Sequence, residues 1–322
     1  MHPAVLQKGG PLMSRYVVGR VLQAVGVMLA ISLITFFILN VIPGDPVQLM
    51  MGEFATPESI AQVRAQMGLD QPIVNQYFNW LRNMLRGDFG TSYFQHRPVL
   101  DMLLNSFGYT ARLAVFAYIL ALVVGLTFGI LAAVFHNKVI DRVLMTLSIA
   151  GVSAPNFWVA IILQIYFGLT LKWFPISGAK DWHYYVLPAI ALGTRYAASI
   201  SRITRTSMLE VTKQDYMRTA SAKGVHGWML VMKHAFRNAL IPVVTVAGTD
   251  LGNILTGSML IETVFTIDGI GKLMVDAINQ RDLPLVQGGV MYIAMVCVMI
   301  YLLVDMLYAV IDPRIRLGGG AE

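Results

Sequence analysis

The sequence predicts an all-α integral membrane protein with six transmembrane helices. Of its 322 residues, 56% are hydrophobic and 13% are charged, and the mean hydropathy is +0.63. Soluble domains carry about 25% charged residues, so this chain is too apolar to form one soluble core. About 20 apolar residues cross the hydrocarbon core of a bilayer as a helix. Six segments meet that length, at residues 21–42, 113–135, 143–171, 186–209, 241–265 and 285–311.

Basic residues beside these spans predict the orientation of the chain. Six crossings place both termini on one side, and lysine and arginine are enriched in cytoplasmic loops. All four basic clusters fall on one side under this topology: Arg15 with Arg20, Lys138 with Arg142, the loop after the fourth span, and Arg314 with Arg316. We therefore expect both termini in the cytoplasm. The net charge of +6 then reflects these loops and membrane lipid, and no nucleic-acid partner is expected.

The first span is expected to be a retained helix, residues 15–42, that follows an N-terminal extension, residues 1–14. Two glycines and a proline at residues 9–11 argue against a helix within the extension. A cleaved signal peptide is the alternative, because basic residues precede the apolar run. The run is longer than the apolar region of a signal peptide and lacks a small-x-small cleavage site, which favours a retained helix.

Residues 43–106 form the largest predicted loop, on the extracytoplasmic side. Its patterning predicts two helices, at residues 57–67 and 73–85. A threonine and a proline precede and open the first helix, and a proline also opens the second. Further along, Pro155 interrupts the third span, which predicts a kink there that is either a hinge or a static bend.

The fourth and fifth spans carry small and polar residues that suit helix contacts or a polar passage. A charge at the centre of a bilayer costs about 2.5–3.5 kcal/mol on insertion scales, so charged residues there should face protein or water. The candidates for a translocation path are Arg195, Asp250 and Asn253, with a static ion pair as the alternative. Glu262 and Asp305 lie close to predicted span ends, so we expect local solvation of both.

A polar, basic segment, residues 215–242, separates the fourth and fifth spans. No carboxylate occurs between residues 216 and 249, which predicts an acidic or acceptor-rich partner. The pattern indicates helix, turn, helix: Thr212 as a cap, glycines at positions 224 and 227 for the reversal, and Pro242 at the start of the next span. The alternative is a basic loop that only fixes topology.

Catalytic and metal-binding patterns are absent from the sequence. Residues 269–272 (GIGK) lack the first glycine and the final Ser or Thr of a phosphate-binding loop. The six histidines are scattered, and the single cysteine, Cys297, lies in an apolar run. We therefore expect no catalytic residue, no metal site and no cofactor bound by this chain.

The basic segment resembles the EAA signature of ABC importer permease subunits. The matching residues are RTASAKG at 218–224 and HAFRNALIP at 234–242. This form is similar to the branch that carries peptides, nickel and related small solutes. Further matches follow in order along the chain: NVIPGDP at 40–46, LDQP at 69–72, GDFGTS at 87–92, ETVF at 262–265 with GIG at 269–271, and DPRIR at 312–316. Arg218 replaces the signature's glutamate, which puts a glutamate-based contact in doubt.

The resemblance implies the fold of a type I ABC importer permease in a bacterial inner membrane. Its five-helix core would span residues 107–312, with a cytoplasmic coupling loop at 210–242 and a tail at 313–322. The implied partners are a second, homologous permease in a heterodimer, two cytoplasmic ATPases and an extracytoplasmic binding protein. ATP and Mg would be bound by the ATPases. The outer loop would face the binding protein, or would only cover helix ends.

Residues 216–228 would form the coupling helix in an ATPase cleft. The expected coupling residues are Tyr216, Arg218, Thr219, Ala220, Lys223, Gly224, His234 and Arg237. Gly224 would permit a reversal that a side chain would obstruct.

The implied function is ATP-driven import of a peptide or similar small solute by alternating access. Nickel or a metal chelate is an alternative solute. An ATPase-independent channel or secondary transporter is the alternative from another class, and a membrane-embedded enzyme is disfavoured because no catalytic constellation is present.

Overall fold

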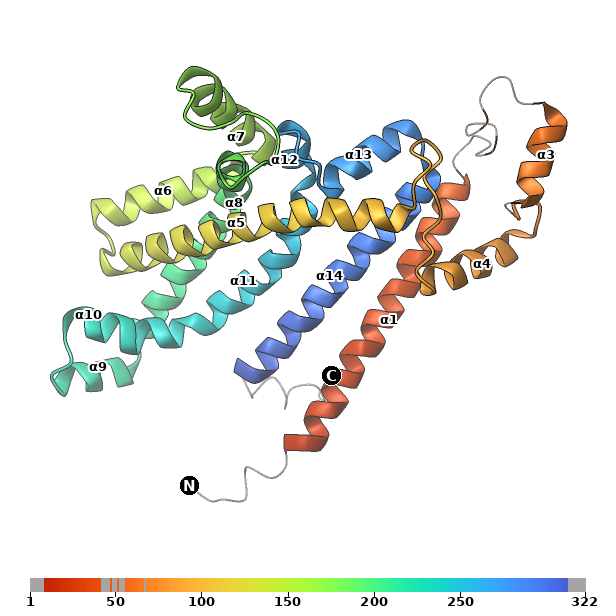
Figure 1. Cartoon of the computed structure of the whole chain (residues 1–322). Helices are drawn as coiled ribbons and strands as arrows, with labels where there is room; N and C mark the ends of the chain where they lie inside the picture. Colours follow the sequence, from red (N-terminus) through yellow and green to blue (C-terminus); the bar gives the residue numbers. More distant parts are fainter. Residues whose placement is uncertain (1–8, 42–46, 48–50, 52–55, 67, 312–322) are drawn as a thin grey trace. The chain divides into compact units, whose positions relative to one another are not determined.

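The computed structural model describes residues 9–41, 47, 51, 56–66 and 68–311. Within these residues the regular elements are helices, and an isolated bridge pairs Thr91 with Pro98 (Figure 1). The elements are α1 (Gly9–Val41), α3 (Pro57–Gln66), α4 (Ile73–Leu85), α5 (Val99–Val134), α6 (Val139–Ser153), α7 (Asn156–Leu163), η2 (Gln164–Thr170), α8 (His183–Thr212), α9 (Asp215–Ala222), α10 (Gly227–Met229), η3 (Leu230–Phe236), α11 (Arg237–Gly257), α12 (Met259–Val264), α13 (Ile270–Gln280) and α14 (Leu283–Ile311).

The predicted spans fall on helical segments, and the third is divided between α6 and α7–η2. Four helical segments are long and apolar enough to cross a membrane: Val17–Phe37, Val99–Val134, Gly227–Val264 and Leu283–Met306. A fifth is formed if the bent pair α6 and α7–η2 is one crossing. The 30-residue helix α8, predicted as the fourth span, is long enough to cross a membrane but is more polar than these segments. Its many buried residues show that packing against other helices, rather than lipid, covers most of its surface.

The kink predicted at Pro155 is confirmed, and it is a bend of 105° between α6 and α7. The third predicted span is therefore not one straight helix. Pro155 lacks a backbone N–H, and its ring restricts the preceding residue to extended conformations. Ala154 accordingly ends α6 with φ −75° and ψ 130°.

The structure tests the prediction made for residues 9–11, but not those made for the PGDP motif and the C-terminal tail. The expected break at residues 9–11 is wrong, because α1 already begins at Gly9. Proline is tolerated in the first turn of a helix, where backbone N–H groups have no intrahelical partner. Residues 1–8, the PGDP motif at 43–46 and the tail at 313–322 lie outside the described residues.

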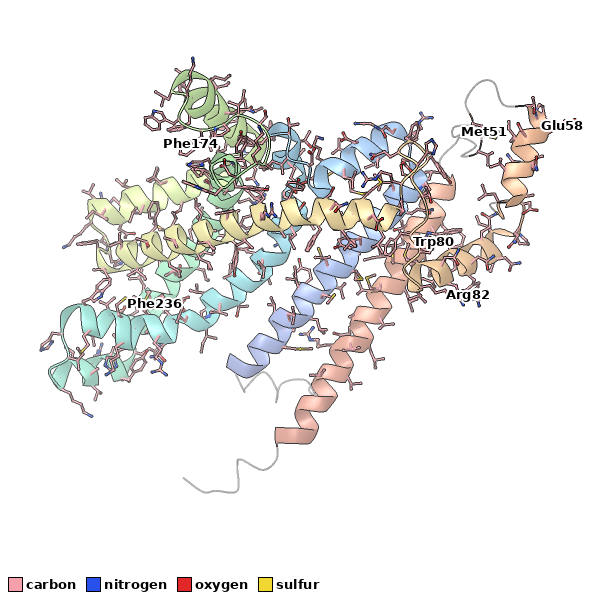
Figure 2. All side chains as sticks on the ribbon, viewed as in Figure 1. Met51, Glu58, Trp80, Arg82, Phe174 and Phe236 are labelled. Carbon is pink, nitrogen blue, oxygen red and sulfur yellow. The ribbon has the colours of Figure 1, made fainter. Side chains whose placement is uncertain are left out.

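The chain divides into two compact units, Met1–Gly108 with Leu273–Met299 and Tyr109–Lys272 with Ile300–Glu322. In the first unit, α4 packs on α1: the hydroxyls of Ser32 and Tyr77 are 2.9 Å apart, and the rings of Phe36 and Trp80 are 5.5 Å apart between centroids. Trp80 is labelled on α4 in Figure 2. The two helices predicted in this loop are confirmed as α3 and α4. A threonine caps α3 as expected, since the Thr56 hydroxyl accepts a bond from Ser59 N at 3.3 Å.

A second polar contact in the first unit joins the loop after α4 to the turn before α14. Ser92 Oγ donates to the carboxylate of Asp282, which is fully buried, and Tyr93 N donates to the same carboxylate at 3.2 Å. Burial and the charge of Asp282 raise the pKa of Tyr93 to about 12, so this phenol stays neutral. The GDFGTS motif thus has a structural role next to a buried aspartate.

The second unit is organised around α8, which packs against α6, α7 and α11. Two glycines of α5, four residues apart, allow close approach to α8. A Cβ on Gly125 would lie 2.8 Å from the carbonyl oxygen of Ala197, and one on Gly129 would lie 2.5 Å from Cβ of Thr204. Small residues at this spacing let two helix backbones come together, as is common between membrane helices.

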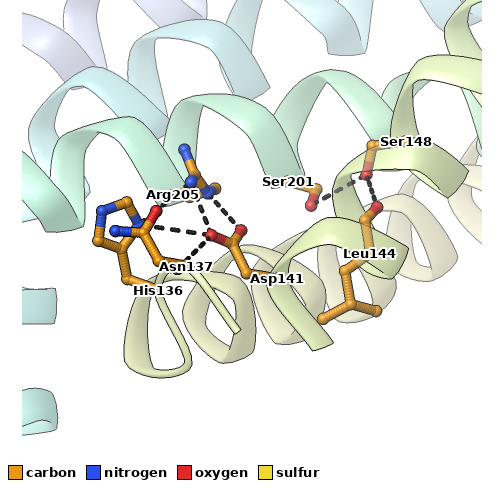
Figure 3. A network of polar contacts seen from close by, with 7 residues as sticks. All are labelled: His136, Asn137, Asp141, Leu144, Ser148, Ser201 and Arg205. Carbon is orange, nitrogen blue, oxygen red and sulfur yellow. Dashed lines mark hydrogen bonds and ion pairs between the residues drawn. The ribbon is translucent and has the colours of Figure 1, made fainter. Parts of the chain in front are cut away.

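A partly buried ion pair also holds α8 (Figure 3). Asp141, in the first turn of α6, accepts two bonds from Arg205 of α8, at 2.6 Å from Nε and 2.8 Å from Nη2. The backbone N–H of Asn137 donates to the same carboxylate at 2.9 Å, and His136 Nδ1 lies 3.4 Å from it. Ser148 Oγ and Ser201 Oγ, 3.3 Å apart, link the same two helices two turns further along α6. The α5–α6 turn is therefore fixed to α8 through a bidentate charged contact.

The helical segment Gly227–Val264 forms an unbroken column of 38 residues, built from α10, η3, α11 and α12. Pro242 was expected to open the fifth span but lies inside α11. The helix therefore begins well before the apolar run. Prolines inside helices are tolerated in membrane proteins, where neighbouring groups satisfy the freed backbone carbonyl.

Glu262, near the C-terminal end of this column, is fully buried, which corrects the expectation that it would be locally solvated. Its Oε1 accepts bonds from the hydroxyls of Thr110 (2.8 Å) and Ser258 (2.9 Å), and its Oε2 accepts from Lys272 N (3.1 Å). Thr110 Oγ1 in turn accepts from Ile270 N at 2.8 Å. The turn that carries the GIG motif is thus bound to a carboxylate of α12 and a hydroxyl of α5.

Candidate functional site

The segment that joins α8 to the helical column is the first candidate site, and we call residues 213–229 the elbow. It contains α9, a turn and α10 (Figure 1). Met217 anchors α9: it is 5% exposed in a small core with Met208, Ala235 and Ala239. The remaining surface of α9 is mostly exposed. The predicted helix, turn, helix is confirmed, because one short helix lies on the base of the next.

The end of α9 explains the AKG element at residues 222–224. Gly224 N donates to Ser221 O at 3.0 Å, and Val225 N donates to Ala220 O at 3.2 Å. This pair of bonds is the Schellman motif, which requires a left-handed residue after the helix. Gly224 has φ +86°. The expectation that a side chain would obstruct this reversal agrees with the positive φ. The constraint is the backbone angle and not a neighbouring atom, because a Cβ at Gly224 would meet nothing within 4 Å.

Two further expectations about the elbow are corrected. The helix spans eight residues, Asp215–Ala222, instead of residues 216–228. Thr212 does not cap it, because its hydroxyl donates to Leu209 O of α8 at 2.9 Å and Gln214 occupies the cap position. The Schellman turn ends α9 at Ala222, before the predicted end at residue 228. The column then begins at Gly227.

The elbow presents a basic and partly apolar face. Arg218 and Lys223 are exposed, as are Tyr216 and Thr219, and Arg237 is exposed at the base of the column; Ala220 and His234 are half-buried. Sequence reasoning missed Trp228 and Met229, which are 62% and 61% exposed. Large apolar residues within a polar segment were the signal that could have found them. Such a mixed face suits a protein partner better than water alone.

The second candidate site is a cavity of about 560 Å³ between α8 and α11, which we call the polar cavity. The structure brings all three expected path residues together at its walls. Its lining residues are Val152, Arg195, Tyr196, Ser199, Arg202, Asp250, Asn253, Thr256 and Gly257. Asp250 Oδ2 is buried and has no hydrogen-bond partner among the described residues, and both the translocation path and the static ion pair stay predictions.

The cavity lies where two exposed polar stripes meet. On α8 the exposed or half-exposed residues at helical spacing are Arg195, Ser199, Arg202, Thr206 and Glu210. On α11 they are Thr245, Thr249, Asn253 and Thr256. Lipid-facing helices of this chain instead expose Val, Ile, Leu and Phe, as α5 does. Because charged groups are costly to expose to lipid, the two stripes must face water or another protein.

Tyr301 of α14 is a further residue of this region that sequence reasoning missed. Its hydroxyl donates to Asn253 Oδ1 at 3.3 Å, and its ring lies over Gly252, where a Cβ would come within 2.6 Å. The glycine in a polar helix face was the only available signal. Among the described residues, no group of three or more His, Cys, Asp or Glu side chains is placed to hold a metal ion.

Comparison with known proteins identifies the family. A family model described as binding-protein-dependent transport system inner membrane component matches residues 125–317, and the model of its N-terminal part matches residues 13–114. The chain belongs to this family. It is an ABC importer permease subunit, a multi-pass transport protein of the inner membrane.

Relatives and solved structures agree with this assignment. The glutathione transport system permease protein GsiC of Salmonella choleraesuis (strain SC-B67) is 41% identical to the permease over 304 residues, which cover 94% of this chain and 99% of GsiC. GsiC of Escherichia coli (strain K12) is 40% identical over the same coverage. The inward-facing MetNI methionine ABC transporter has a TM-score of 0.54 at 16% identity, covering 66% of this chain and 96% of that chain. This last likeness concerns the fold alone.

Proposed function

We propose that this permease subunit imports a peptide or peptide-like small solute, which an extracytoplasmic binding protein delivers. Two ATPase subunits would dock at the elbows of this chain and of a second, homologous permease. ATP and Mg would be bound by the ATPases, and alternating access would move the solute into the cytoplasm. The relatives named as glutathione permeases support a peptide-like solute.

The observation that carries the proposal is the continuity between elbow and cavity. The column Gly227–Val264 begins in the elbow and supplies one wall of the polar cavity, and α8, the other wall, ends at the elbow. A partner that moves the elbow therefore moves both walls. The two polar stripes must also face water or another protein, because charged groups are costly to expose to lipid. We propose that they face the second permease across a central passage.

Docking is proposed to rest on the exposed cations and aromatic groups of the elbow. Arg218 and Lys223 project from a surface that contains no carboxylate between residues 216 and 249, so an acidic or acceptor-rich face of an ATPase would be complementary. Tyr216 and Trp228 supply apolar area of the kind that anchors protein interfaces. His234 and Arg237 lie further along the column and would support the same contact.

Reconstitution of the four kinds of subunit in liposomes tests the proposal. We expect uptake of a labelled peptide that requires ATP and the loaded binding protein, and no uptake when the ATPase cannot hydrolyse ATP. Peptide uptake by this chain alone without ATP would establish the rival channel or secondary transporter. Uptake of a nickel chelate but of no peptide would replace the proposed solute.

Charge reversal tests the elbow within the same system. Arg218→Glu and Lys223→Glu should abolish most of the ATP hydrolysis that the loaded binding protein stimulates, because each places a like charge against the acidic partner. Arg142→Glu is the matched control, since Arg142 is also exposed beside a predicted cytoplasmic turn but lies outside the elbow. Equal loss in the control, or no loss at the elbow, would contradict docking there.

A further inference from the structure

The polar cavity has an unequal set of charges. Arg195 and Arg202 line it from α8, and Asp250 lines it from α11, while its other lining residues are neutral. Arginine remains protonated throughout the physiological range. With the carboxylate ionised, the cavity carries two positive groups and one negative group. The complementary solute has two carboxylates and one ammonium group.

Asp250 marks the position for a positive group. It is 9% exposed and its Oδ2 has no hydrogen-bond partner within the described part of the chain. Buried polar atoms are normally satisfied, so an orphan oxygen on a cavity wall calls for a partner that the protein itself does not supply. An ammonium group offers three donors and the opposite charge, and it therefore suits this carboxylate.

The two arginines mark positions for negative groups. They are seven residues apart on α8, which is two helical turns and about 10 Å along the axis. They therefore lie on one face, and each guanidinium can bind a carboxylate with two parallel hydrogen bonds. Ser199 lies between them, and Asn253 and Thr256 face the cavity from α11, so donors and acceptors for amide groups are also present.

The size of the cavity fits a small peptide. Its volume of about 560 Å³ falls in the range of about 300–1,000 Å³ that is usual for small-molecule sites. Resting on the proposed function, we infer that the polar cavity is a binding subsite for peptide-like solutes with a net charge of −1. Asp250 binds the ammonium group, and Arg195 and Arg202 bind the two carboxylates.

Two dipeptides of nearly equal shape test this assignment in the assembled transporter. Alanyl-glutamate carries two carboxylates and one ammonium group, whereas alanyl-glutamine has an amide in place of the second carboxylate. ATP-dependent uptake into liposomes is measured for each peptide at concentrations that saturate the binding protein, so that the step through the membrane is compared. We expect the wild type to transport alanyl-glutamate about tenfold faster, since a hydrogen bond to a charged group contributes about that factor.

Substitutions at the cavity then separate the two poles. The two peptides share their C-terminal carboxylate, so one of Arg195→Gln and Arg202→Gln should remove the preference for alanyl-glutamate, and the other should lower uptake of both peptides. Lysine at the arginine that sets the preference keeps the charge and should retain most of the preference. Asp250→Asn should lower uptake of both peptides about tenfold and leave their ratio unchanged, because both carry the ammonium group. Arg142→Gln, at an exposed position outside the cavity, should change neither rate.

The ratio within one preparation is independent of how much transporter assembles, so a poorly assembled variant does not obscure the result. Equal wild-type rates for the two peptides would overturn the inference and leave the proposed function intact. A preference for alanyl-glutamate that is unchanged in both Arg195→Gln and Arg202→Gln would also overturn the inference and leave the proposed function intact. Failure of the wild type to transport any peptide would instead overturn the proposed function.

Discussion

Replacement of Gly224 by valine isolates the backbone requirement of the elbow. Gly224 has φ +86° and closes α9 through two backbone bonds, of 3.0 and 3.2 Å. Nothing lies within 4 Å of a Cβ there, so the substitution adds no clash. A side chain in the left-handed region costs about 1–2 kcal/mol, and a branched one is the least suited. An energy of that size lowers the ratio of elbows with the native turn to elbows without it by roughly 5- to 30-fold.

The assay is the ATP hydrolysis stimulated by the loaded binding protein, followed as the ATPase subunits are titrated onto the permease pair in nanodiscs. For Gly224→Val, the ATPase concentration at half-maximal stimulation should rise, by at most roughly 30-fold, because only elbows with the native turn bind the ATPase. Gly224→Asn should stay close to wild type, because asparagine tolerates the left-handed region. Gly26→Val, at a helical glycine with no neighbour within 4 Å, controls for the added side chain. An unshifted Gly224→Val curve, or an equally shifted asparagine variant, would refute the reasoning.

Three further predictions use matched pairs. Met217→Ala should lower the stability of the elbow by about 2–5 kcal/mol, measured by limited proteolysis. Met229→Ala, at a residue that is 61% exposed, should weaken ATPase docking and leave protease resistance unchanged. Glu262→Ala leaves the buried donors around residue 262 unpaired and should clearly lower the melting temperature. Asp268→Ala should have little effect, because the exposed ion pair between Asp268 and Lys272 contributes about 0–1 kcal/mol. Arg205→Lys keeps the charge but loses the bidentate contact with Asp141, so thermal unfolding should begin at lower temperature; an unchanged transition would show that the contact is dispensable.

Local signals in the sequence were sufficient where the controlling interaction is local. The helix α4 was predicted at 73–85 and is found at Ile73–Leu85, because a proline and an amphipathic pattern define it. The bend at Pro155 follows from covalent geometry alone. The glycine at position 224 indicated the reversal, because glycine adopts the left-handed conformation without strain. The last residue of α9 depends on the hydrogen bonds of the turn.

Features that depend on distant partners were beyond sequence reasoning. The buried carboxylate of Glu262 accepts a hydrogen bond from Thr110, which is 152 residues away in the sequence. Arg195 and Asp250 were singled out as charges in apolar surroundings, but their arrangement around one cavity depends on how α8 packs on α11. The helix α13 was missed, although Ile270, Met274 and Ala277 are buried at helical spacing. These three apolar residues were too few to stand out beside the long apolar spans.

The column Gly227–Val264 would act as a lever on any movement of the elbow, because one helical segment of 38 residues joins the elbow to Glu262. At 1.5 Å per residue its 38 residues extend over about 57 Å, so a pivot of about 10° at the midpoint displaces each end by roughly 5 Å. The buried carboxylate near one tip and the elbow at the other are therefore coupled through a single rod. Second-site suppressors of elbow substitutions that weaken docking should accordingly arise near Glu262, at the other end of the column.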